Sequence, residues 1–441
     1  MAEVLDYNSA CSYIEETSQY GSRPGLERIR SLCAALGDPQ NDLRFVHIAG
    51  TNGKGSTGAM IASVLTEAGL RTGMYYSPAM TAIYDHYMVD GRLITGEEYA
   101  DAVAAVAAAN ENLRNETGES ATQFEIETAV AFLYFKEKGC DVVVLECGMG
   151  GAEDATNIAG DKMLCVITSI SLDHMQYLGN STEEIAKAKA GIITSPCPVV
   201  TLDADDKITD VIKNRCETVG ATLYTVSPAS IVSDDISSGI TVSCCGLENA
   251  DIPLSGTFQA ENAALAIQAL KIMGEEHLID GRAIDDNIIR SGLQKVKWPY
   301  RFECISEEPL VIVDGAHNED AAAKLAASIR TLLKGRRIII VAGVFADKEY
   351  EKIIRILAGT ADCIVTVRIP DNPRALPSED LAACAGRYCK CVIECRDPCE
   401  GLERALDKAE EYTKAGDKSA IVACGSLSYL ADFAGLVEGI G

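Results

Sequence analysis

The sequence lacks any charge-free apolar stretch of about 18 or more residues, which a membrane-spanning helix requires. Its N-terminus also lacks the basic segment and the apolar segment of a signal peptide. Basic residues are in deficit, because 39 Lys and Arg stand against 65 Asp and Glu, a formal net charge of −26. Such a charge repels polyanions, and we find no concentrated basic patch that would offset it. We therefore expect a cytoplasmic protein without a membrane or nucleic-acid partner.

The 17 cysteines form no pattern typical of secreted disulfide domains, which are short and carry an even number of cysteines. Reduced thiols are therefore the expectation. One stretch is dense in cysteine, and its gaps of five, two, four and four residues match no common zinc site. Its members are Cys384, Cys389, Cys391, Cys395 and Cys399. We interpret them as idle thiols, and the sequence assigns them no role.

Short β-branched runs alternate with helical stretches along the chain, which is typical of parallel strands in doubly wound α/β sheets. The runs are 44–48, 142–145, 165–168, 199–202, 310–313, 337–341 and 363–367. A chain of 441 residues exceeds what one hydrophobic core usually organises. We predict two domains, 1–297 and 298–441, because a new series of strands and helices begins near Leu310.

Residues 221–260 differ from the rest, because Ser, Gly and Thr alternate there with Ile and Val, as in 240–244. This pattern predicts a small antiparallel patch, followed by a helix that starts near Ala260. We find no internal repeat and no low-complexity tract.

A phosphate-binding loop is the strongest chemical signal. An apolar strand leads into Gly50-Thr51-Asn52-Gly53-Lys54-Gly55-Ser56-Thr57, and a helix follows. Glycines let backbone N–H groups curl around phosphate oxygens at the positive end of a helix. Lys54 can neutralise phosphate charge, and Ser56 can offer a hydroxyl to magnesium. The alternative is an ordinary Gly-rich turn, which the placement of Lys54 and Ser56 makes less favourable.

Acidic and basic side chains follow the next predicted strands. Glu146 stands at the end of a buried strand, at the edge where α/β sheets bind ligands, and suits an oxygen-preferring ion such as magnesium. Asp173-His174 follows another strand, and Lys189 lies on the helix after it. Taken alone, a hydrogen-bonded structural histidine is an equally reasonable interpretation of His174, and an exposed helical lysine is the alternative for Lys189.

The loop Gly50-Thr-Asn-Gly-Lys-Gly-Ser56 resembles that of the Mur ligase superfamily, in its folylpolyglutamate synthase and dihydrofolate synthase branch. The resemblance extends in order from about residue 20 to residue 430. It implies an N-terminal P-loop-type domain with a small antiparallel edge and a smaller, Rossmann-like C-terminal α/β domain. It also implies ATP as co-substrate, two magnesium ions and room for a monovalent cation.

In the first domain the resemblance assigns Ser56, Ser77, Glu146 and His174 to magnesium, with Lys189 as a further ligand once carbamylated. Thr122 and Phe124 of a Thr-x-Phe-Glu motif would line a pterin site together with Asp154 and Ala155. The Phe124 ring could stack on the pterin, and Asp154 could accept two hydrogen bonds from it. Gln259 and Asn262 would approach adenine and ribose. A capping cluster is the structural alternative for that last pair.

In the second domain Trp-Pro-Tyr300-Arg301 and Asp314-Gly-Ala-His317-Asn318 match family loops. Arg301 would contact the ATP phosphates. Asp314 and His317 would contact nucleotide and the incoming amino acid, and Ser426 belongs to a weaker matching loop.

The sequence departs from the family pattern in four places. Ala79 replaces a histidine, and Asp85-His86 replaces an acidic and basic pair. Ala152 replaces an arginine, and Tyr300 replaces a glycine between Pro299 and Arg301. These departures fall where the acceptor would lie, so the reaction type is better supported than the acceptor.

We predict a monomeric, ADP-forming ligase that joins L-glutamate to a folate or dihydropteroate through an acyl phosphate. Lys54, Glu146, His174, Lys189, Arg301, Asp314 and His317 are its predicted catalytic groups. Three alternatives remain: a Mur-type ligase with a non-folate acceptor, a P-loop switch or motor ATPase, and a nucleotide-binding paralogue without ligase activity.

Overall fold

The computed structural model describes residues 5–21, 23–80, 84–203, 205–279 and 281–439. The chain forms two compact units, and neither is continuous in sequence. The first contains residues 1–229, 244–247 and 261–295, and the second contains 230–243, 248–260 and 296–441. The predicted domain boundary between residues 297 and 298 stays a prediction. Among the described residues no helix is long and apolar enough to span a membrane.

An eight-stranded sheet organises the first unit, in the order β4-β3-β2-β5-β1-β6-β7-β8. The strands are β1 (Arg44–Ala49), β2 (Thr72–Tyr75), β3 (Tyr87–Val89), β4 (Arg92–Leu93), β5 (Val142–Glu146), β6 (Asp161–Ile167), β7 (Pro198–Leu202) and β8 (Thr222–Val226). All neighbours pair in parallel except β2 with β3 and β3 with β4. Parallel pairing brings the carboxyl ends of β5, β1 and β6 to one edge of the sheet.

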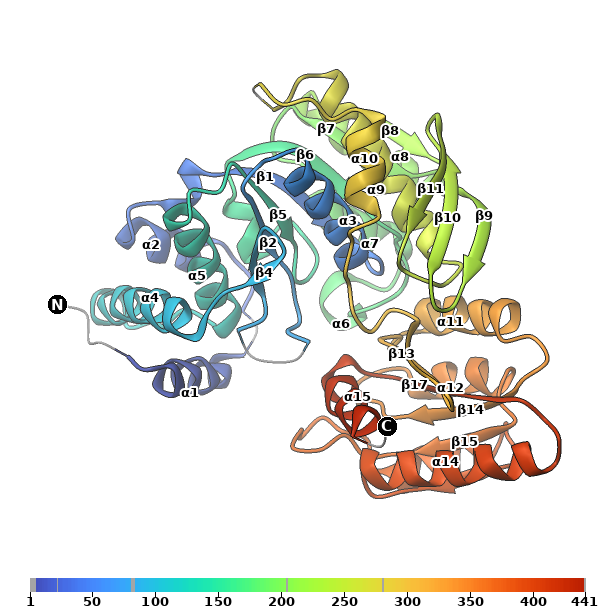
Figure 1. Ribbon diagram of the computed structural model, residues 1–441. Helices are drawn as coiled ribbons and strands as arrows, with labels where there is room; N and C mark the ends of the chain where they lie inside the picture. Colours follow the sequence, from blue (N-terminus) through green and yellow to red (C-terminus); the bar gives the residue numbers. More distant parts are fainter. Residues whose placement is uncertain (1–4, 22, 81–83, 204, 280, 440–441) are drawn as a thin grey trace. The chain divides into compact units, whose positions relative to one another are not determined.

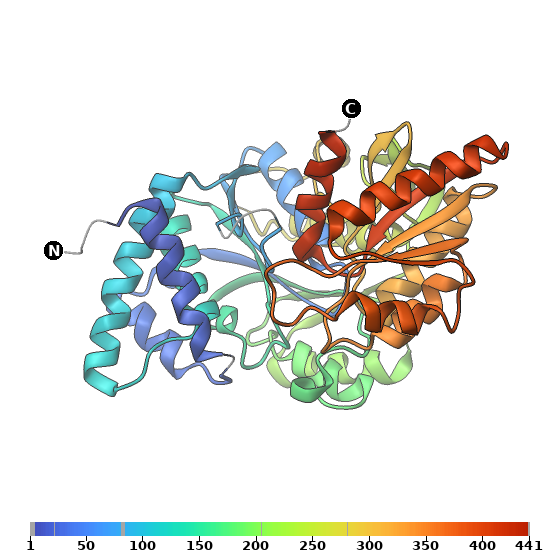
Figure 2. The same cartoon turned by 90° about the horizontal axis from the view of Figure 1, so that it is seen from below.

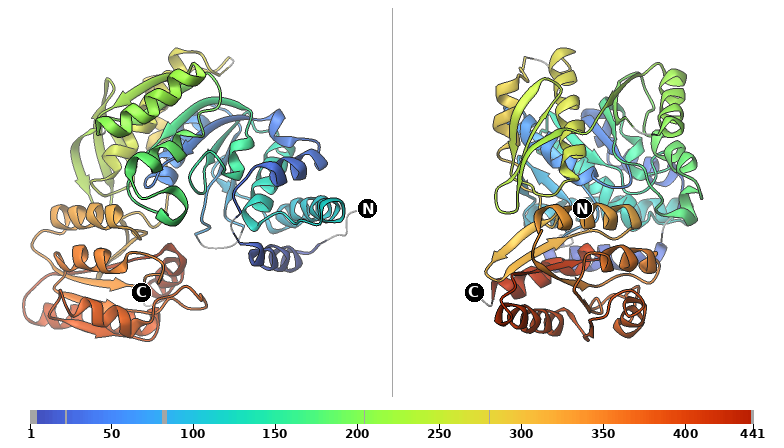
Figure 3. Two further views of the ribbon diagram at one scale, coloured as in Figure 1. Left: turned by 180° about the vertical axis from the view of Figure 1, so that it is seen from behind. Right: turned by 90° about the vertical axis from the view of Figure 1, so that its right-hand side faces the viewer.

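Helices cover both faces of this sheet, as the nearly continuous burial of its central strands requires. Phe45 of β1 packs under α1 (Tyr7–Thr17), α2 (Glu27–Ala35), α4 (Gly96–Thr117) and α5 (Gln123–Glu137). Figure 3 shows α1 and α4 side by side. On the other face α3 (Lys54–Glu67) packs on β2 and β5 and against α10 (Asp286–Leu293). The remaining helices are α6 (Met175–Leu178), α7 (Thr182–Ala190), α8 (Asp206–Val219) and α9 (Gln259–Glu275), with 3-10 turns at Ser18–Tyr20, Pro39–Asp42 and Ala155–Ile158.

The antiparallel patch is smaller than the sequence predicted. Three strands form it, in the order β11-β10-β9: β9 (Ser230–Asp235), β10 (Gly239–Cys244) and β11 (Leu247–Ile252) (Figure 1). Residues 222–226, which we expected in the same patch, instead form β8 and pair in parallel with β7. The reason is α8, which lies between β7 and β8 and makes a parallel crossover of them.

The second unit has a six-stranded sheet, in the order β12-β13-β17-β14-β15-β16. Its strands are β12 (Glu303–Glu307), β13 (Leu310–Asp314), β14 (Arg337–Ala342), β15 (Cys363–Thr366), β16 (Val392–Glu394) and β17 (Ser419–Cys424). Only the β12–β13 pair is antiparallel. One face packs on α11 (Glu319–Leu332), α12 (Tyr350–Ala358) and α13 (Ser378–Ala385).

The opposite face carries α14 (Pro398–Lys414), drawn in red in Figure 2, and α15 (Leu430–Glu438), which follows a 3-10 turn at Leu427–Tyr429. Gly401 lets α14 lie close to the sheet, since a Cβ atom there would be 2.4 Å from Val367. All seven β-branched runs identified in the sequence are strands, which confirms the α/β prediction.

Candidate active site

The phosphate-loop motif lies between β1 and α3, at the carboxyl edge of the first sheet. Gly53 is the residue before α3 and has φ +86°, a conformation that glycine adopts without strain. A Cβ atom on Gly53 would lie 2.2 Å from Asn262 Oδ1. The fold therefore places the Asn262 amide directly against the predicted phosphate loop.

The same loop is bound to the end of β6. The Thr51 N–H donates to the Ser169 carbonyl at 2.7 Å. A Cβ atom on Gly50 would lie 1.7 Å from Thr168 Oγ1, so this position also requires glycine. We did not predict Thr168 and Ser169 as site residues. The available signal was that these polar residues directly follow a buried strand, at the same sheet edge where Glu146 ends β5.

Glu146 ends β5 beside Ile48 of β1, which brings its carboxylate next to the loop. Glu146 is 6% exposed, and its Oε1 lies 3.6 Å from Lys54 Nζ. Lys54 also donates to the Thr51 carbonyl at 3.2 Å. Burial strengthens the attraction between these charges, so each holds the other beside the loop.

Lys189 lies at the other side of the loop, on α7. Its Nζ donates to the Gly50 carbonyl at 2.6 Å, and the residue is 5% exposed. Burial, and then the nearby Lys54 ammonium, lower the pKa of Lys189 to about 7, while Asp173 opposes this shift. A substantial fraction of Lys189 is therefore a neutral, nucleophilic amine near neutral pH.

His174 adopts a left-handed conformation, with φ 50° and ψ 35°, just before α6. Its side chain is 42% exposed, and Nε2 lies 4.0 Å from Asp173 Oδ2. Such conformations are uncommon for non-glycine residues and occur often at functional sites. Ser77 is half-buried in the segment after β2.

The chemistry of these donors fits magnesium. No group of three or more His, Cys, Asp and Glu among the described residues could hold a metal by itself. Magnesium does not need one, because it usually binds one or two carboxylates and completes its shell with waters and substrate phosphates. Glu146 and the buried Ser56 at the start of α3 provide that kind of incomplete set.

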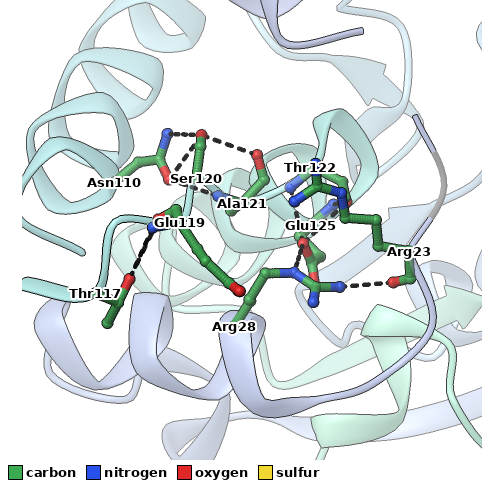
Figure 4. A network of polar contacts seen from close by, with 9 residues as sticks. All are labelled: Arg23, Arg28, Asn110, Thr117, Glu119, Ser120, Ala121, Thr122 and Glu125. Atoms are coloured by element: carbon green, nitrogen blue, oxygen red, sulfur yellow. Dashed lines mark hydrogen bonds and ion pairs between the residues drawn. The ribbon is translucent and has the colours of Figure 1, made fainter. Parts of the chain in front are cut away.

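The predicted pterin residues also lie in the first unit. The Phe124 ring packs on Gly148, where a Cβ atom would lie 2.4 Å from it, and its centroid is 6.2 Å from that of Tyr75. Thr122 caps α5 together with Glu125, whose Oε2 accepts the Thr122 N–H at 2.8 Å (Figure 4). Arg28 donates to the same oxygen at 3.2 Å. Thr122 and Glu125 thus hold the start of α5, and with it Phe124, in place.

Asp154 is buried, and its carboxylate binds its own loop. Oδ2 accepts the Met149 N–H at 2.8 Å, and Oδ1 accepts the Thr156 N–H at 3.0 Å and the Thr156 hydroxyl at 2.5 Å. A carboxylate has about four lone-pair positions. These three donors occupy most of that capacity, and the two hydrogen bonds from a pterin that we predicted for Asp154 stay a prediction. Ala155, buried, begins the adjacent 3-10 turn.

In the second unit Asp314 ends β13, and both of its oxygens are bound to the backbone. Oδ2 accepts the Phe302 N–H at 2.9 Å, and Oδ1 accepts the Ala316 N–H at 2.8 Å. Burial raises the pKa of Asp314 to about 6, while Arg301 opposes this shift. The Arg301 guanidinium lies over Gly315, where a Cβ atom would be 2.6 Å from Nη1.

Strained backbone flanks Arg301. Tyr300 has φ 59° and Phe302 has φ 51°, which costs about 1–3 kcal/mol per residue. Tyr300, which stands where the family pattern has a glycine, therefore adopts a conformation that glycine would take without strain. Its N–H donates to Glu303 Oε2 at 2.7 Å, and its carbonyl accepts the Gly315 N–H at 2.9 Å. These bonds hold Arg301 against the Asp314 loop.

The other predicted residues of the second unit lie as follows. His317 Nδ1 is 2.8 Å from the Gly315 carbonyl, a bond that requires the proton on Nδ1. Asp314 pairs with Cys424 of β17, so Ser426 follows at the same sheet edge. Gln259 is fully buried at the start of α9.

Two departures from the family pattern have local structural roles. Both Asp85 oxygens accept the Met80 N–H at 3.0 Å, and His86 Nδ1 donates to the Tyr76 carbonyl at 2.8 Å. Ala152 packs against Gly191, where a Cβ atom would lie 2.4 Å from the Ala152 methyl group. Ala79 is half-buried in the same segment as Ser77.

The cysteine-dense stretch gains a partner that its sequence did not suggest. Cys391 Sγ lies 2.7 Å from Cys363 Sγ, because Cys363 begins β15 and Cys391 precedes the paired β16. Cys384, Cys389 and Cys395 are buried, and Cys399 is exposed.

Two protein-family models match the chain. The Mur ligase middle domain matches residues 48–270, and the Mur ligase, glutamate ligase domain matches residues 300–427. The dihydrofolate synthase/folylpolyglutamate synthase of Bacillus subtilis (strain 168) is 36% identical over 434 residues, covering 97% of this chain and 98% of that protein. Its counterpart from Escherichia coli (strain K12) is 31% identical over 428 residues, covering 95% and 93%.

Solved structures match equally well. Mycobacterium tuberculosis folylpolyglutamate synthase, complexed with ADP and AMPPCP, superposes with a TM-score of 0.88 at 29% identity and covers 99% of both chains. Escherichia coli FolC in complex with DHPP and ADP superposes with a TM-score of 0.82 at 29% identity, again over 99% of both chains.

Proposed function

Because the chain belongs to the dihydrofolate synthase and folylpolyglutamate synthase family of Mur ligases, it is an ATP-dependent ligase that adds glutamate to folates, and we propose how its residues carry out that reaction. The observation that carries the proposal is the juxtaposition of Lys54, Glu146 and Lys189 around one phosphate loop. A loop of this kind, beside a buried carboxylate and two amines, suits a triphosphate.

ATP binds with its phosphates on the N–H groups between Gly50 and Thr57, which lie at the positive end of α3. Lys54 neutralises phosphate charge, and Asn262, which contacts Gly53, binds the nucleoside. Glu146 and Ser56 would hold magnesium, which supplies positive charge to the phosphate oxygens during phosphoryl transfer. In the second unit, Arg301 and Asp314 are the residues that we propose for nucleotide binding.

The acceptor carboxylate attacks the γ-phosphorus of ATP, which forms an acyl phosphate and releases ADP. Lys54 and Arg301 stabilise the charge that develops on the transferred oxygens. The α-amine of L-glutamate then attacks the acyl carbon and expels phosphate, and an amide bond remains. His317 and Ser426 lie at the edge of the second sheet and bind the amino acid in this proposal.

Lys189 reacts with carbon dioxide through its neutral amine, losing a proton and gaining a carbamate. The product is an anionic oxygen donor beside Gly50 of the phosphate loop, where it could serve as a metal ligand. A lysine pKa of about 7 supports this step, since only the unprotonated amine is nucleophilic. Mass spectrometry of the intact protein with and without bicarbonate tests it, because the carbamylated protein is heavier by one carbon dioxide.

Phe124 stacks on the pterin of the acceptor, and Asp154 accepts a hydrogen bond from its ring or amino nitrogen. Dihydropteroate and reduced folates share that pterin, so both are acceptors in the proposal. ATP, L-glutamate and the folate are the partners of a cytoplasmic monomer.

Purified protein incubated with ATP, magnesium, L-glutamate and either dihydropteroate or tetrahydrofolate tests the assignment, with ADP release and product mass as readouts. Labelling the acceptor carboxylate with heavy oxygen should transfer one labelled oxygen to phosphate. Lys54→Met and Glu146→Gln should each abolish ADP release, and full turnover by either variant would contradict the roles given to them. Glutamate-dependent ADP release without a folate product would indicate a different acceptor.

A further inference from the structure

His47 is an unusual residue for its position in the fold. It lies in the middle of β1, between β5 and β6, and is fully buried. Phe45, Val46 and Ile48 around it are apolar, as expected for a central parallel strand. A histidine there needs a reason, because an aliphatic residue would pack without burying two polar nitrogens.

The hydrogen bonds of His47 lead to Asp154. His47 Nε2 lies 2.9 Å from Thr156 Oγ1, and Thr156 Oγ1 lies 2.5 Å from Asp154 Oδ1. Burial raises the pKa of Asp154, but Oδ1 already accepts the Thr156 N–H, as an ionised carboxylate oxygen does, so the single Thr156 hydroxyl proton points to Asp154. The hydroxyl oxygen must then accept from His47, which places the imidazole proton on Nε2.

This arrangement leaves His47 incompletely satisfied. Burial lowers the pKa of His47 well below its usual range, so the ring is neutral and Nδ1 carries no proton. Nδ1 is buried and has no hydrogen-bond partner among the described residues. A buried acceptor without a partner lowers the free energy of unfolding, so structural stability alone does not account for a histidine at this position.

We propose that His47 and Thr156 are positioning residues for the folate acceptor, which fix the Asp154 carboxylate so that one lone pair of Oδ2 faces the pterin. The Thr156 N–H and hydroxyl occupy Oδ1, and His47 holds that hydroxyl, while Oδ2 accepts the Met149 N–H and would accept one ligand N–H donor. The inference rests on the proposed role of Asp154 in binding the acceptor. In this proposal His47 and Thr156 affect the affinity for the acceptor through Asp154 and do not bind the acceptor themselves.

Substituting His47→Val and Thr156→Val separates this role from a structural one. Dihydropteroate affinity, measured by quenching of pterin fluorescence, should fall ~10-fold in each, as for the loss of a bond to a charged group. The KM for ATP should stay unchanged. His47→Val should unfold at no lower temperature than the wild type, because it removes the unpaired Nδ1. Thr156→Ser and His47→Gln keep a hydroxyl and an N–H and should restore most of the affinity.

Thr201→Val is the matched control, since Thr201 is a buried threonine of the same sheet whose hydroxyl donates to the Ile167 carbonyl. It should leave dihydropteroate affinity unchanged. Wild-type affinity in His47→Val, or equal weakening of ATP and dihydropteroate, would overturn the proposal. Asp154→Asn separates the role of Asp154 from the positioning role of His47. If Asp154→Asn binds dihydropteroate normally, the proposed role of Asp154 is wrong. If Asp154→Asn loses affinity while His47→Val keeps it, only the positioning role is wrong.

Discussion

Arg301 lies so close to Gly315 that a Cβ atom on the glycine would be 2.6 Å from Arg301 Nη1. Because Gly315 has no Cβ atom, the Arg301 guanidinium can lie on the backbone of the Asp314 loop. Real Cβ atoms essentially never come so near another atom. Because the backbone at Gly315 cannot move away, the flexible Arg301 side chain would have to do so.

Gly315→Ala should therefore displace Arg301 and lower kcat/KM for ATP by about 10–100-fold, as for the loss of a donor to developing charge. Steady-state kinetics measures this. Gly435→Ala in α15 is the control, because nothing lies within 4 Å of that Cβ position. Alanine also favours the helix there, so this variant should keep its activity and unfold at a slightly higher temperature.

Gly53→Ala should weaken ATP binding by at least ~10-fold, since the new methyl group would collide with Asn262 Oδ1 at 2.2 Å. Gly37→Ala carries the same kind of backbone strain, with φ +77° against +86°, but nothing lies within 4 Å of it. Isothermal titration with ATP should show a loss only for Gly53→Ala. Equal losses would mean that strain, and not contact with Asn262, governs the site.

Lys189 should make stability depend on pH in carbon-dioxide-free buffer. Its pKa falls from 10.5 in the unfolded chain to about 7 in the folded one. Between these values the unfolded chain binds more protons, so the free energy of unfolding rises with pH across this window. At pH 7 and below, the burial of Lys189 lowers the free energy of unfolding by its full amount.

Lys189→Met should therefore be more stable than the wild type near pH 7, by an amount on the order of a few kcal/mol. The difference should shrink as the pH approaches 10.5. Thermal unfolding of both proteins at the two ends of the window measures this. The variant should also lose ligase activity, and a variant that keeps it would remove Lys189 from the site.

Cys363 and Cys391 should form a disulfide on exposure to oxidised glutathione, because their sulfurs are 2.7 Å apart on adjacent strands. The two thiols lose two protons and two electrons, and the glutathione disulfide is reduced to two thiols. Peptide mapping without reductant should recover the linked pair in the wild type and in Cys399→Ser, but not in Cys391→Ser. Cross-linking that needs Cys399 would refute the pairing.

Much of the fold could be predicted from local patterns. Apolar runs such as 142–145 are strands because both of their faces must be buried, and the glycine loop at Gly50–Gly53 follows from what a phosphate requires of the backbone. Glu146 and Asp314 could be found in the same way, since each ends a buried strand at the edge where ligands bind. The strand at 222–226 was misassigned because its pairing depends on the preceding helix rather than on its own residues.

The sequence by itself therefore determined the α/β class, the phosphate loop and the order of the chemical groups, because each depends on residues that are neighbours in the chain. Only the tertiary structure decided that Asn262 contacts Gly53, that Cys391 meets Cys363 and that His47 reaches Asp154 through Thr156. Each of these contacts depends on strand register and helix packing between distant segments, which bring together side chains that no local pattern pairs. Arg301 shows both contributions: its motif marked it in the sequence, and Gly315 and the strained backbone of Tyr300 and Phe302 set its position.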